Sequence, residues 1–194
     1  MNEVFQVTRW RGDNQLPLEN ARLVRNQVPS DTNIWGIWFG LFGLRANELL
    51  VVTHAATPNS EVLATVPGNV EDTISMVPTV RPTSTTPPQK EGLYVFRFFD
   101  THPQHIDEIA SLSNTAWTTF ESTTEYHAEP LALFASHNNT DDAATMLLIT
   151  WYDTFDSWQI SRQPHPDAKQ NFLRRRALTT STLPIATRLI VPGQ

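Results

Sequence analysis

Residues 130–152 read PLALFASHNNTDDAATMLLITWY, and this stretch decides the fold. Two apolar runs, Pro130 to Ser136 and Thr145 to Tyr152, flank a polar insert, which is the pattern of a β-hairpin. A third apolar run, Leu93 to Phe99, precedes them, and its one charged residue is Arg97. A run that is apolar on both faces predicts a central strand with covering layers on each side.

Helical patterns lie between and after these strands. Thr101 is the expected N-cap of a helix whose apolar residues recur at helical spacing from Ile106 to Phe120. Asp153 is the expected cap of a second helix, which prolines at 164 and 166 break into two pieces. A last strand is expected over Ile185 to Val191. The order strand, helix, strand, strand, helix, strand is the βαββαβ signature of a ferredoxin-like unit.

A fainter copy of this order precedes it, from Glu3 to Pro82. We expect its strands at Val4–Trp10, Ile34–Phe42, Glu48–Thr53 and Ser75–Val80, and short helices at Leu18–Val28 and Glu61–Val66. The predicted domains are a degenerate ferredoxin-like half at residues 1–82, a proline-containing linker at 83–92 and a complete ferredoxin-like half at 93–194. The alternative is that the repeated pattern arises by chance.

The fold class predicted from these patterns is α+β. We expect tandem ferredoxin-like βαββαβ units, each with an antiparallel sheet. Because the earlier half has only short helical segments, we expect any functional pocket in the later half.

Composition narrows the range of partners. The chain has 194 residues, no cysteine and a net charge of −6. The lack of cysteine removes disulfides and thiolate sites and favours a reducing compartment. The negative charge argues against a nucleic-acid partner, and no apolar stretch approaches the roughly 20 residues needed to cross a bilayer. Because polar residues follow Met1, we predict a cytoplasmic protein with neither a membrane nor a nucleic-acid partner.

Charge is unevenly distributed along the second half. Between Arg97 and Arg162 the charged side chains are all acidic. Basic residues then gather towards the end of the chain, at Arg162, Lys169, Arg174, Arg175, Arg176 and Arg188. We expect surface arginines that pair with a solvated acidic face. A helix-borne anion site is the alternative.

The segment from Leu147 to Arg162 resembles the NIPSNAP-like proteins of the dimeric α/β-barrel superfamily. In it, a strand that ends in Trp151 and Tyr152 runs into a helix with Trp158. The resemblance rests on motifs in the second half and on architecture alone in the first. Members of this superfamily usually build the barrel from two subunits, and they include cofactor-independent monooxygenases, isomerases and haem enzymes. The resemblance implies that one chain supplies both antiparallel sheets here and that they pack as an intrachain dimeric α/β-barrel. The protein would then be a monomer, or a dimer joined through an outer face.

The resemblance also implies where a site would lie, in a cavity between a sheet and its own helices. The predicted catalytic residues are His54 and His127 as bases, with Tyr152 and Arg162 stabilising an oxyanion. The predicted ligand-binding residues are Trp151, Trp158 and Tyr126. For His54 at the end of a strand, the alternative is a hydrogen-bonded structural role.

No cofactor is predicted. His102 and His105 lie three residues apart at the start of a helix, but no third ligand at a diagnostic spacing accompanies them, so no metal site is expected. No histidine stands out as an axial ligand, which leaves haem open. Two functions follow: a cofactor-independent monooxygenase or isomerase that acts on a small apolar or aromatic molecule by proton abstraction, or a non-catalytic binding or interaction protein. The sequence does not decide whether the protein is an enzyme.

Overall fold

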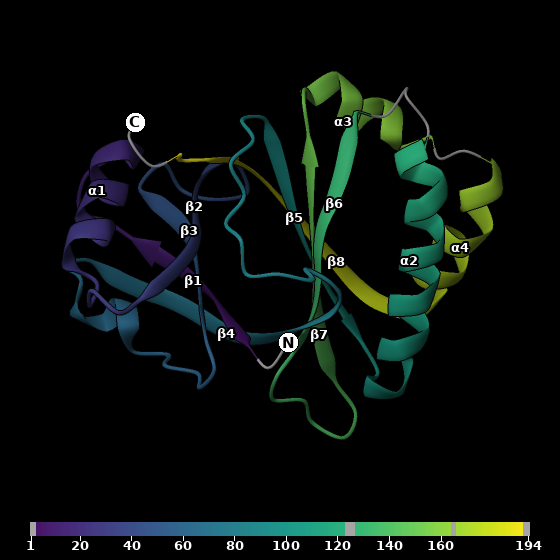
Figure 1. Ribbon diagram of the computed structural model, residues 1–194, viewed down its shortest axis with the longest axis horizontal. Coiled ribbons are helices and arrows are strands. Elements are labelled where there is room, and N and C mark those ends of the chain that lie inside the picture. Colours follow the sequence, from purple (N-terminus) through teal and green to yellow (C-terminus); the bar gives the residue numbers. More distant parts are fainter. Residues whose placement is uncertain (1–2, 123–126, 164–165, 192–194) are drawn as a thin grey trace. The chain divides into compact units, whose positions relative to one another are not determined.

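The computed structural model describes residues 3–122, 127–163 and 166–191 (Figure 1). In chain order, the elements of the first half are β1 (Val4–Arg11), α1 (Pro17–Gln27), β2 (Asn33–Phe42), β3 (Glu48–Ala55), the 3-10 helix η1 (Val62–Thr65) and β4 (Asn69–Arg81). The second half contains β5 (Leu93–Thr101), the 3-10 helix η2 (Pro103–His105), α2 (Ile106–Ser122), β6 (Ala128–Ser136), β7 (Ala144–Tyr152), α3 (Phe155–Ser161), α4 (Pro166–Ala177) and β8 (Thr179–Leu189).

Each half has the order predicted for a ferredoxin-like unit. Hydrogen-bonded neighbours follow the strand order β1-β3-β2-β8-β5-β7-β6-β4, which closes on itself through β4 and β1. The registers described for β1 with β3 and for β5 with β7 are antiparallel. The α+β fold class, with tandem ferredoxin-like units of the dimeric α/β-barrel type in one chain, is therefore confirmed.

The chain forms two compact units that exchange strand segments. The first unit comprises Met1–Val77, Ser84–Glu91 and Ile185–Gln194, and the second comprises Pro78–Thr83 and Gly92–Pro184. Strand β4 passes into the second unit at Pro78, and β8 leaves it after Pro184. Proline has no N–H to donate to a sheet. Both strands therefore change unit at a residue that cannot donate a ladder hydrogen bond.

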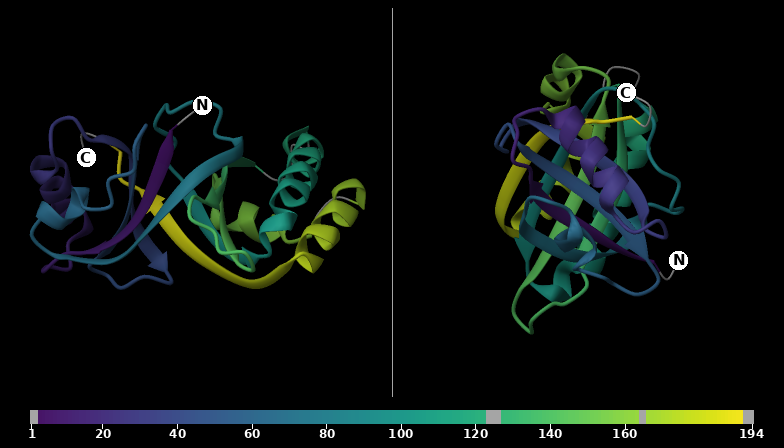
Figure 2. Two further views of the ribbon diagram at one scale, coloured as in Figure 1. Left: turned by 90° about the horizontal axis from the view of Figure 1, so that it is seen from below. Right: turned by 90° about the vertical axis from the view of Figure 1, so that its left-hand side faces the viewer.

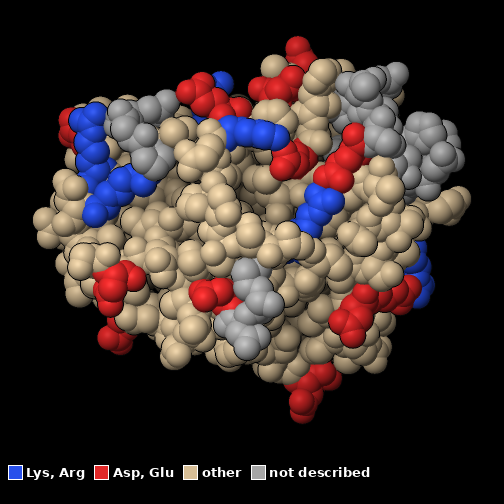
Figure 3. Space-filling view, viewed as in Figure 1, with Lys and Arg blue, Asp and Glu red and all other residues tan. Residues whose placement is uncertain are grey.

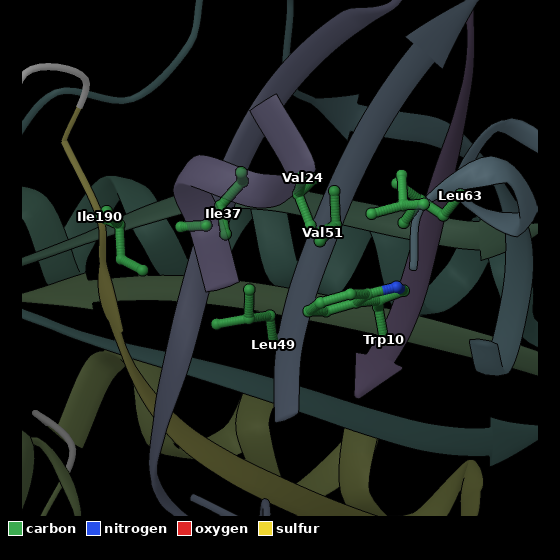
Figure 4. Packing of buried hydrophobic residues seen from close by; sticks show 9 residues of the cluster. Trp10, Val24, Ile37, Leu49, Val51, Leu63 and Ile190 are labelled. Atoms are coloured by element: carbon green, nitrogen blue, oxygen red, sulfur yellow. The ribbon is translucent and has the colours of Figure 1, made fainter. Parts of the chain in front are cut away.

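The first unit has a continuous apolar core that joins its sheet to α1 and η1 (Figure 4). The buried members of this core are Trp10, Ala21, Val24, Ile37, Leu49, Val51, Leu63, Val66 and Ile190. Ile190 comes from the end of the chain, directly after β8, and its backbone N–H donates to the carbonyl of Ile37 at 2.8 Å. Burial of these side chains ties the last strand to the first half.

The sheet of the second unit presents two different faces. Arg97 on β5 lies opposite Leu148 on β7, and Tyr152 is the last residue of β7. Because side chains alternate along a strand, Arg97, Leu148 and Tyr152 share one face, while Phe96 and Ile149 lie on the other. The helix α2 contributes Trp117 as a buried side chain, and α4 lies beside α2 (Figure 2).

The predicted cap of the first long helix is wrong. Thr101 is the last residue of β5, and its hydroxyl donates to the carbonyl of Leu178 at 2.6 Å. The cap is the next residue, His102, whose Nδ1 accepts from the backbone N–H of Gln104 at 3.3 Å. The strand β5 thus extends to Thr101, the residue at which the helix cap was expected.

The predicted cap of α3 is also wrong by one residue. Thr154 is the N-cap, and its Oγ1 accepts from the backbone N–H of Ser157 at 3.2 Å. Asp153 accepts instead from the hydroxyl of Ser157, and this hydrogen bond is the main reason that the pKa of Asp153 is lowered. The predicted interruption of the second helix is confirmed, because α3 ends at Ser161 and α4 begins at Pro166.

β4 and β8 begin well before their predicted starts, whereas the bounds of the other strands differ from the predictions by one or two residues. β4 begins at Asn69 instead of Ser75, and β8 begins at Thr179 instead of Ile185. The added segments are polar, so they lack the apolar alternation that marks a strand. The last of the predicted short helices, at Glu61–Val66, is the 3-10 helix η1.

Candidate functional site

The second unit contains a cavity of about 490 Å³ between one face of its sheet and helices α2, α3 and α4. Sites for small molecules typically have volumes of about 300–1,000 Å³. All of the residues that line this cavity belong to the second unit. The cavity therefore lies in the half where the sequence predicts it, between the sheet and its own helices.

Residues of β5, β6, β7 and β8 line the cavity on the sheet side, and alternating positions of β5 and β7 form most of this wall. β5 contributes Arg97 and Phe99, and β7 contributes Leu148, Thr150 and Tyr152. These side chains share one face because they occupy every second position of paired strands. Near this wall, the pairing of β6 with β7 shifts register after Pro130, which also lines the cavity.

Helical residues form the opposite wall. Trp117 lies on α2, Ser161 is the last residue of α3, and Phe172 and Leu173 lie on α4. The contacts of α4 are chiefly with α2, and α3 contacts β7. Because α4 packs on a helix instead of on the sheet, the strand face beneath it stays open. Breaking one long helix into α3 and α4 thus makes room for the cavity.

Five basic side chains line this cavity, and none of the described lining residues is acidic. The basic residues are Arg97, Arg162, Lys169, Arg175 and Arg176. On the face of the molecule seen in Figure 3, Lys and Arg side chains instead lie near Asp and Glu. The cavity lining therefore differs from this surface, because its basic side chains have no acidic residues among them.

The expectation that the arginines pair with acidic residues holds for Arg174 and fails for its neighbour in the sequence. Arg174 Nε lies 2.7 Å from Glu108 Oε1, outside the cavity. Among the described residues, no carboxylate lies within ion-pair distance of Arg97, Arg162 or Arg175. The helix α4 thus places a paired arginine and an unpaired one at successive positions.

Burial and the repulsion of nearby positive charges lower the pKa values of Arg97 and Arg175. Burial, with the positive charges of Arg97 and Arg162 adding to it, lowers the pKa of Arg175 to about 10. Burial also lowers the pKa of Arg97, and the charge of Arg162 acts in the same direction. Arg175 Nη1 donates to the hydroxyl of Ser113 at 3.2 Å, and its guanidinium lies 5.1 Å from the ring centre of Phe172. Ser113 and Phe172 are neutral, so these contacts hold the guanidinium of Arg175 in place without neutralising its charge.

Two of the predicted catalytic residues line the cavity, Tyr152 and Arg162. Tyr152 is only 5% exposed, whereas Arg162 is exposed and lies with its guanidinium 5.9 Å from the ring centre of Trp158. Trp158 contacts Phe155 with the two rings tilted by 39° and their centres 4.9 Å apart. It lies next to the cavity residues in sequence but is not part of the described lining.

The other predicted residues lie elsewhere. Trp151 points to the opposite face of the sheet from Tyr152, because it is the preceding residue of β7. His127 is well exposed, and its Nδ1 lies 3.7 Å from Asp153 Oδ2. Neither residue lines the cavity, and Tyr126 falls outside the described residues.

His54 belongs to the first unit, at the end of β3. Its Nδ1 lies 3.0 Å from Glu3 Oε2, and its ring centre lies 5.5 Å from that of Phe5. A largely buried, hydrogen-bonded histidine of this kind matches the structural alternative considered for this residue. His54 is not among the described residues that line the cavity, all of which belong to the second unit.

Sequence reasoning missed several residues that define the cavity. Arg97 interrupts an otherwise apolar strand, and this interruption was the available signal for it. Arg175 was assigned to the surface, and Phe99 and Trp117 were assigned to strand and helix cores. All four line the cavity.

Among its described residues, the first unit has no counterpart of the charged wall. The first strand of each unit begins opposite the last residue of its third strand, which is Ala55 in the first unit and Tyr152 in the second. Counted from these ends, Thr8 stands in the first unit at the position that Arg97 holds in the second. Thr8 and Ala55 therefore stand in the first unit at the positions of Arg97 and Tyr152 in the second. Trp10 and Val51 fill the apolar core nearby.

The cavity does not suit a haem held by the commonest axial ligands. Its described lining contains no histidine, cysteine or methionine, which are the side chains that most often ligate haem iron. In the described parts of the chain, no group of three His, Cys, Asp or Glu residues could hold a metal ion. The chemistry of this site is accordingly considered from its arginines, tyrosine and aromatic side chains.

Solved structures with the same fold cover nearly the whole chain. An anthrone oxidase-like protein matches with a TM-score of 0.63 and 10% identity, over 98% of this chain and 92% of that protein. A ferredoxin-fold protein from Listeria monocytogenes, related to antibiotic biosynthesis monooxygenases, matches with a TM-score of 0.53 and 10% identity, over 96% and 95%. A mutant chlorite dismutase from Candidatus Nitrospira defluvii matches with a TM-score of 0.54 and 10% identity, over 97% and 91%.

At these identities the likeness establishes the fold, which is that of the dimeric α/β-barrel proteins. Neither a family model nor the sequence of a curated protein matches the chain. Among the described helices, none is long and apolar enough to cross a membrane.

Proposed function

We propose that the second unit binds a small molecule with an apolar or aromatic body in the cavity between its sheet and its helices. The observation that carries this proposal is the cavity itself, with a volume of about 490 Å³ and an aromatic lining that includes Phe99, Trp117 and Phe172. Aromatic side chains offer large apolar contact areas to a planar ligand. Several solved structures of the same fold are described as oxidase-like or monooxygenase-related, which supports a small-molecule site in this architecture.

A second candidate function is catalysis of the kind found in cofactor-independent monooxygenases and isomerases. It is favoured by Tyr152 and Arg162, which line the cavity and would stabilise an oxyanion left after a substrate loses a proton. Neither His127 nor His54 is in the described lining, so the cavity supports anion stabilisation more directly than proton removal. Binding alone is therefore the function that the geometry supports best.

We also propose that this chain is related to the NIPSNAP-like proteins in particular, among proteins with this fold. Its support is the succession of Tyr152, Trp158 and Arg162 from the end of β7 through α3, of which two residues line the cavity. A cytoplasmic location is supported by the absence of cysteine from the sequence.

The binding proposal is tested with two tryptophan substitutions on one helix. Small aromatic compounds are screened for stabilisation by thermal shift, because a ligand that binds the folded state raises the melting temperature. Compounds that stabilise the wild type are retested on Ser161→Trp, which fills the cavity, and on Gln159→Trp, which adds the same side chain at an exposed position of α3.

We expect the thermal shifts to disappear in Ser161→Trp and to persist in Gln159→Trp. Shifts that persist in both variants would place the binding site elsewhere and overturn the proposal. For the catalytic candidate, bound compounds are incubated with the protein in air and analysed by mass spectrometry. Conversion that requires Tyr152 would favour an enzyme, and recovery of unchanged compounds would favour a binding protein.

A further inference from the structure

The cavity arginines carry information about the ligand beyond its apolar body. Arg97 lies in the middle of a paired strand, so its backbone is fixed by the ladder between β5 and β7. The structure gives its guanidinium no hydrogen bond and no ion pair with any described residue. A partly buried charge without a partner is costly, and proteins usually compensate it with an opposite charge. The compensating group is absent from the described part of this chain.

We infer that the ligand of this cavity is an organic acid, with an apolar or aromatic body and one anionic group that Arg97 and Arg175 bind. This inference rests on the proposed function and names the chemical class of the ligand. A guanidinium presents a planar set of donors that matches a carboxylate or a similar oxyanion. Arg97 comes from the sheet and Arg175 from α4, so the two charges approach the cavity from opposite walls.

The apolar part of the ligand follows from the neighbours of the arginines. On the face that carries Arg97, the residue two positions along β5 is Phe99, and the residue across on β7 is Leu148. The ring of Phe172 on α4 lies against the guanidinium of Arg175, in a cation–π contact. An anion seated between these arginines therefore has apolar side chains beside it, which suits the body of an organic acid better than a free inorganic ion.

The fold itself does not require this charge. In the first unit, Thr8 stands at the position of Arg97, and its hydroxyl lies 3.1 Å from that of Thr73. That unit closes the corresponding region with an apolar core. Because the same architecture forms without an arginine there, the three unpaired arginines of the second unit are better explained by a ligand than by folding.

A pair of fluorescent probes with one aromatic skeleton tests the inference. 1-Anilinonaphthalene-8-sulfonate carries an anionic group, and N-phenyl-1-naphthylamine is the same skeleton without it. Both are titrated into the wild type, Arg97→Met, Arg175→Met and the control Arg174→Met. Arg174 is the matched control because it lies on α4 next to Arg175 but pairs with Glu108 outside the cavity. Circular dichroism and melting temperature confirm that each variant is folded.

We expect the Kd of the sulfonate to rise by about tenfold or more in Arg97→Met and in Arg175→Met, and to stay unchanged in Arg174→Met. The Kd of the neutral probe should stay within about twofold in all four proteins, because its apolar contacts are kept. Added salt should weaken the sulfonate alone.

Equal Kd values for the sulfonate in the wild type and in both cavity variants would overturn the inference, while binding of the neutral probe would leave the proposed cavity function intact. Failure of both probes to bind the wild type would count against the proposed function and the inference together. Because Arg97 and Arg175 lie on different elements, either folded variant is sufficient for the test.

Discussion

Replacing Arg175 by methionine should make the ligand-free protein more stable at neutral pH. Methionine keeps an apolar stem of similar length beside Phe172 and removes a charge that Arg97 and Arg162 repel. The substitution also removes the hydrogen bond from the guanidinium to Ser113. The sign of the net effect therefore depends on which of these contributions is larger.

The pKa of Arg175 gives the size of the unfavourable contribution. The value is about 10 in the folded protein, well below the ordinary value of an arginine. At about 1.4 kcal/mol per pH unit, this lowering corresponds to between about 3 and 4 kcal/mol, and partial solvent exposure reduces it to about 2 kcal/mol. Loss of the hydrogen bond and of the contact with Phe172 offsets about 1 kcal/mol. The expected net gain is about 1 kcal/mol, or about 2–4 °C in melting temperature.

The pH dependence distinguishes this explanation from a general packing effect. From about pH 10 up to the ordinary pKa of an arginine, the unfolded chain binds more protons at Arg175 than the folded protein does, so the stability of the wild type rises with pH in that window. Below about pH 10 the full penalty applies, because both states are protonated. The advantage of Arg175→Met should therefore be present at pH 7 and shrink above pH 10.

Urea unfolding followed by tryptophan fluorescence measures these differences, at pH 7 and at about pH 11, for the wild type, Arg175→Met and Arg174→Met. The exposed pair of Arg174 with Glu108 should contribute little, so its variant should stay within about 0.5 kcal/mol of the wild type. If Arg175→Met is less stable than the wild type at pH 7, the guanidinium is compensated in the free protein, and the reasoning about an unpaired cavity charge is refuted.

Two further predictions concern the elements that border the cavity. Gly92→Ala should destabilise the protein by about 2–3 kcal/mol in urea unfolding, because Gly92 has a φ of 143° and an added Cβ would meet the carbonyl of Tyr152. Gly43→Ala is the control: Gly43 has a φ of 92°, but an added Cβ would have its nearest contacts at 3.5 Å, so the substitution should cost only about 1 kcal/mol. Equal costs for the two variants would contradict the steric argument. Thr154→Ala should lower the free energy of unfolding by about 1 kcal/mol because it removes the cap of α3, whereas Thr154→Ser should keep most of the wild-type stability. If Thr154→Ser is as unstable as Thr154→Ala, the methyl group of Thr154 and not its hydroxyl is responsible for the stability.

The sequence predicted the elements that have strong periodicity. The hairpin of β6 and β7, the strand β5 and the break between α3 and α4 all follow from apolar runs and prolines. The polar starts of β4 and β8 were missed because their pairing partners lie far away in the sequence. Caps at Thr101 and Asp153 were displaced by one residue because neighbouring polar side chains compete for the same role.

The site was predicted less completely than the fold. Tyr152 and Arg162 could be placed near a cavity because they follow a strand end and a broken helix. Arg97 was visible as a charge in an apolar strand, but alternation alone does not say which face covers a cavity. His54 was attractive as a base because its partner Glu3, which lies far away along the chain, cannot be identified from local pattern.

The exchange of strand segments at Pro78 and Pro184 bears on how such a chain can evolve. A deletion that removed either half would also remove a segment that the other half needs, because Pro78–Thr83 serves the second unit and Ile185–Gln194 the first. Loss of either half should therefore destabilise the other, although each half can change its interior on its own. The two interiors do differ, because Trp10 and Val51 fill the core of the first unit whereas arginines line an open cavity in the second.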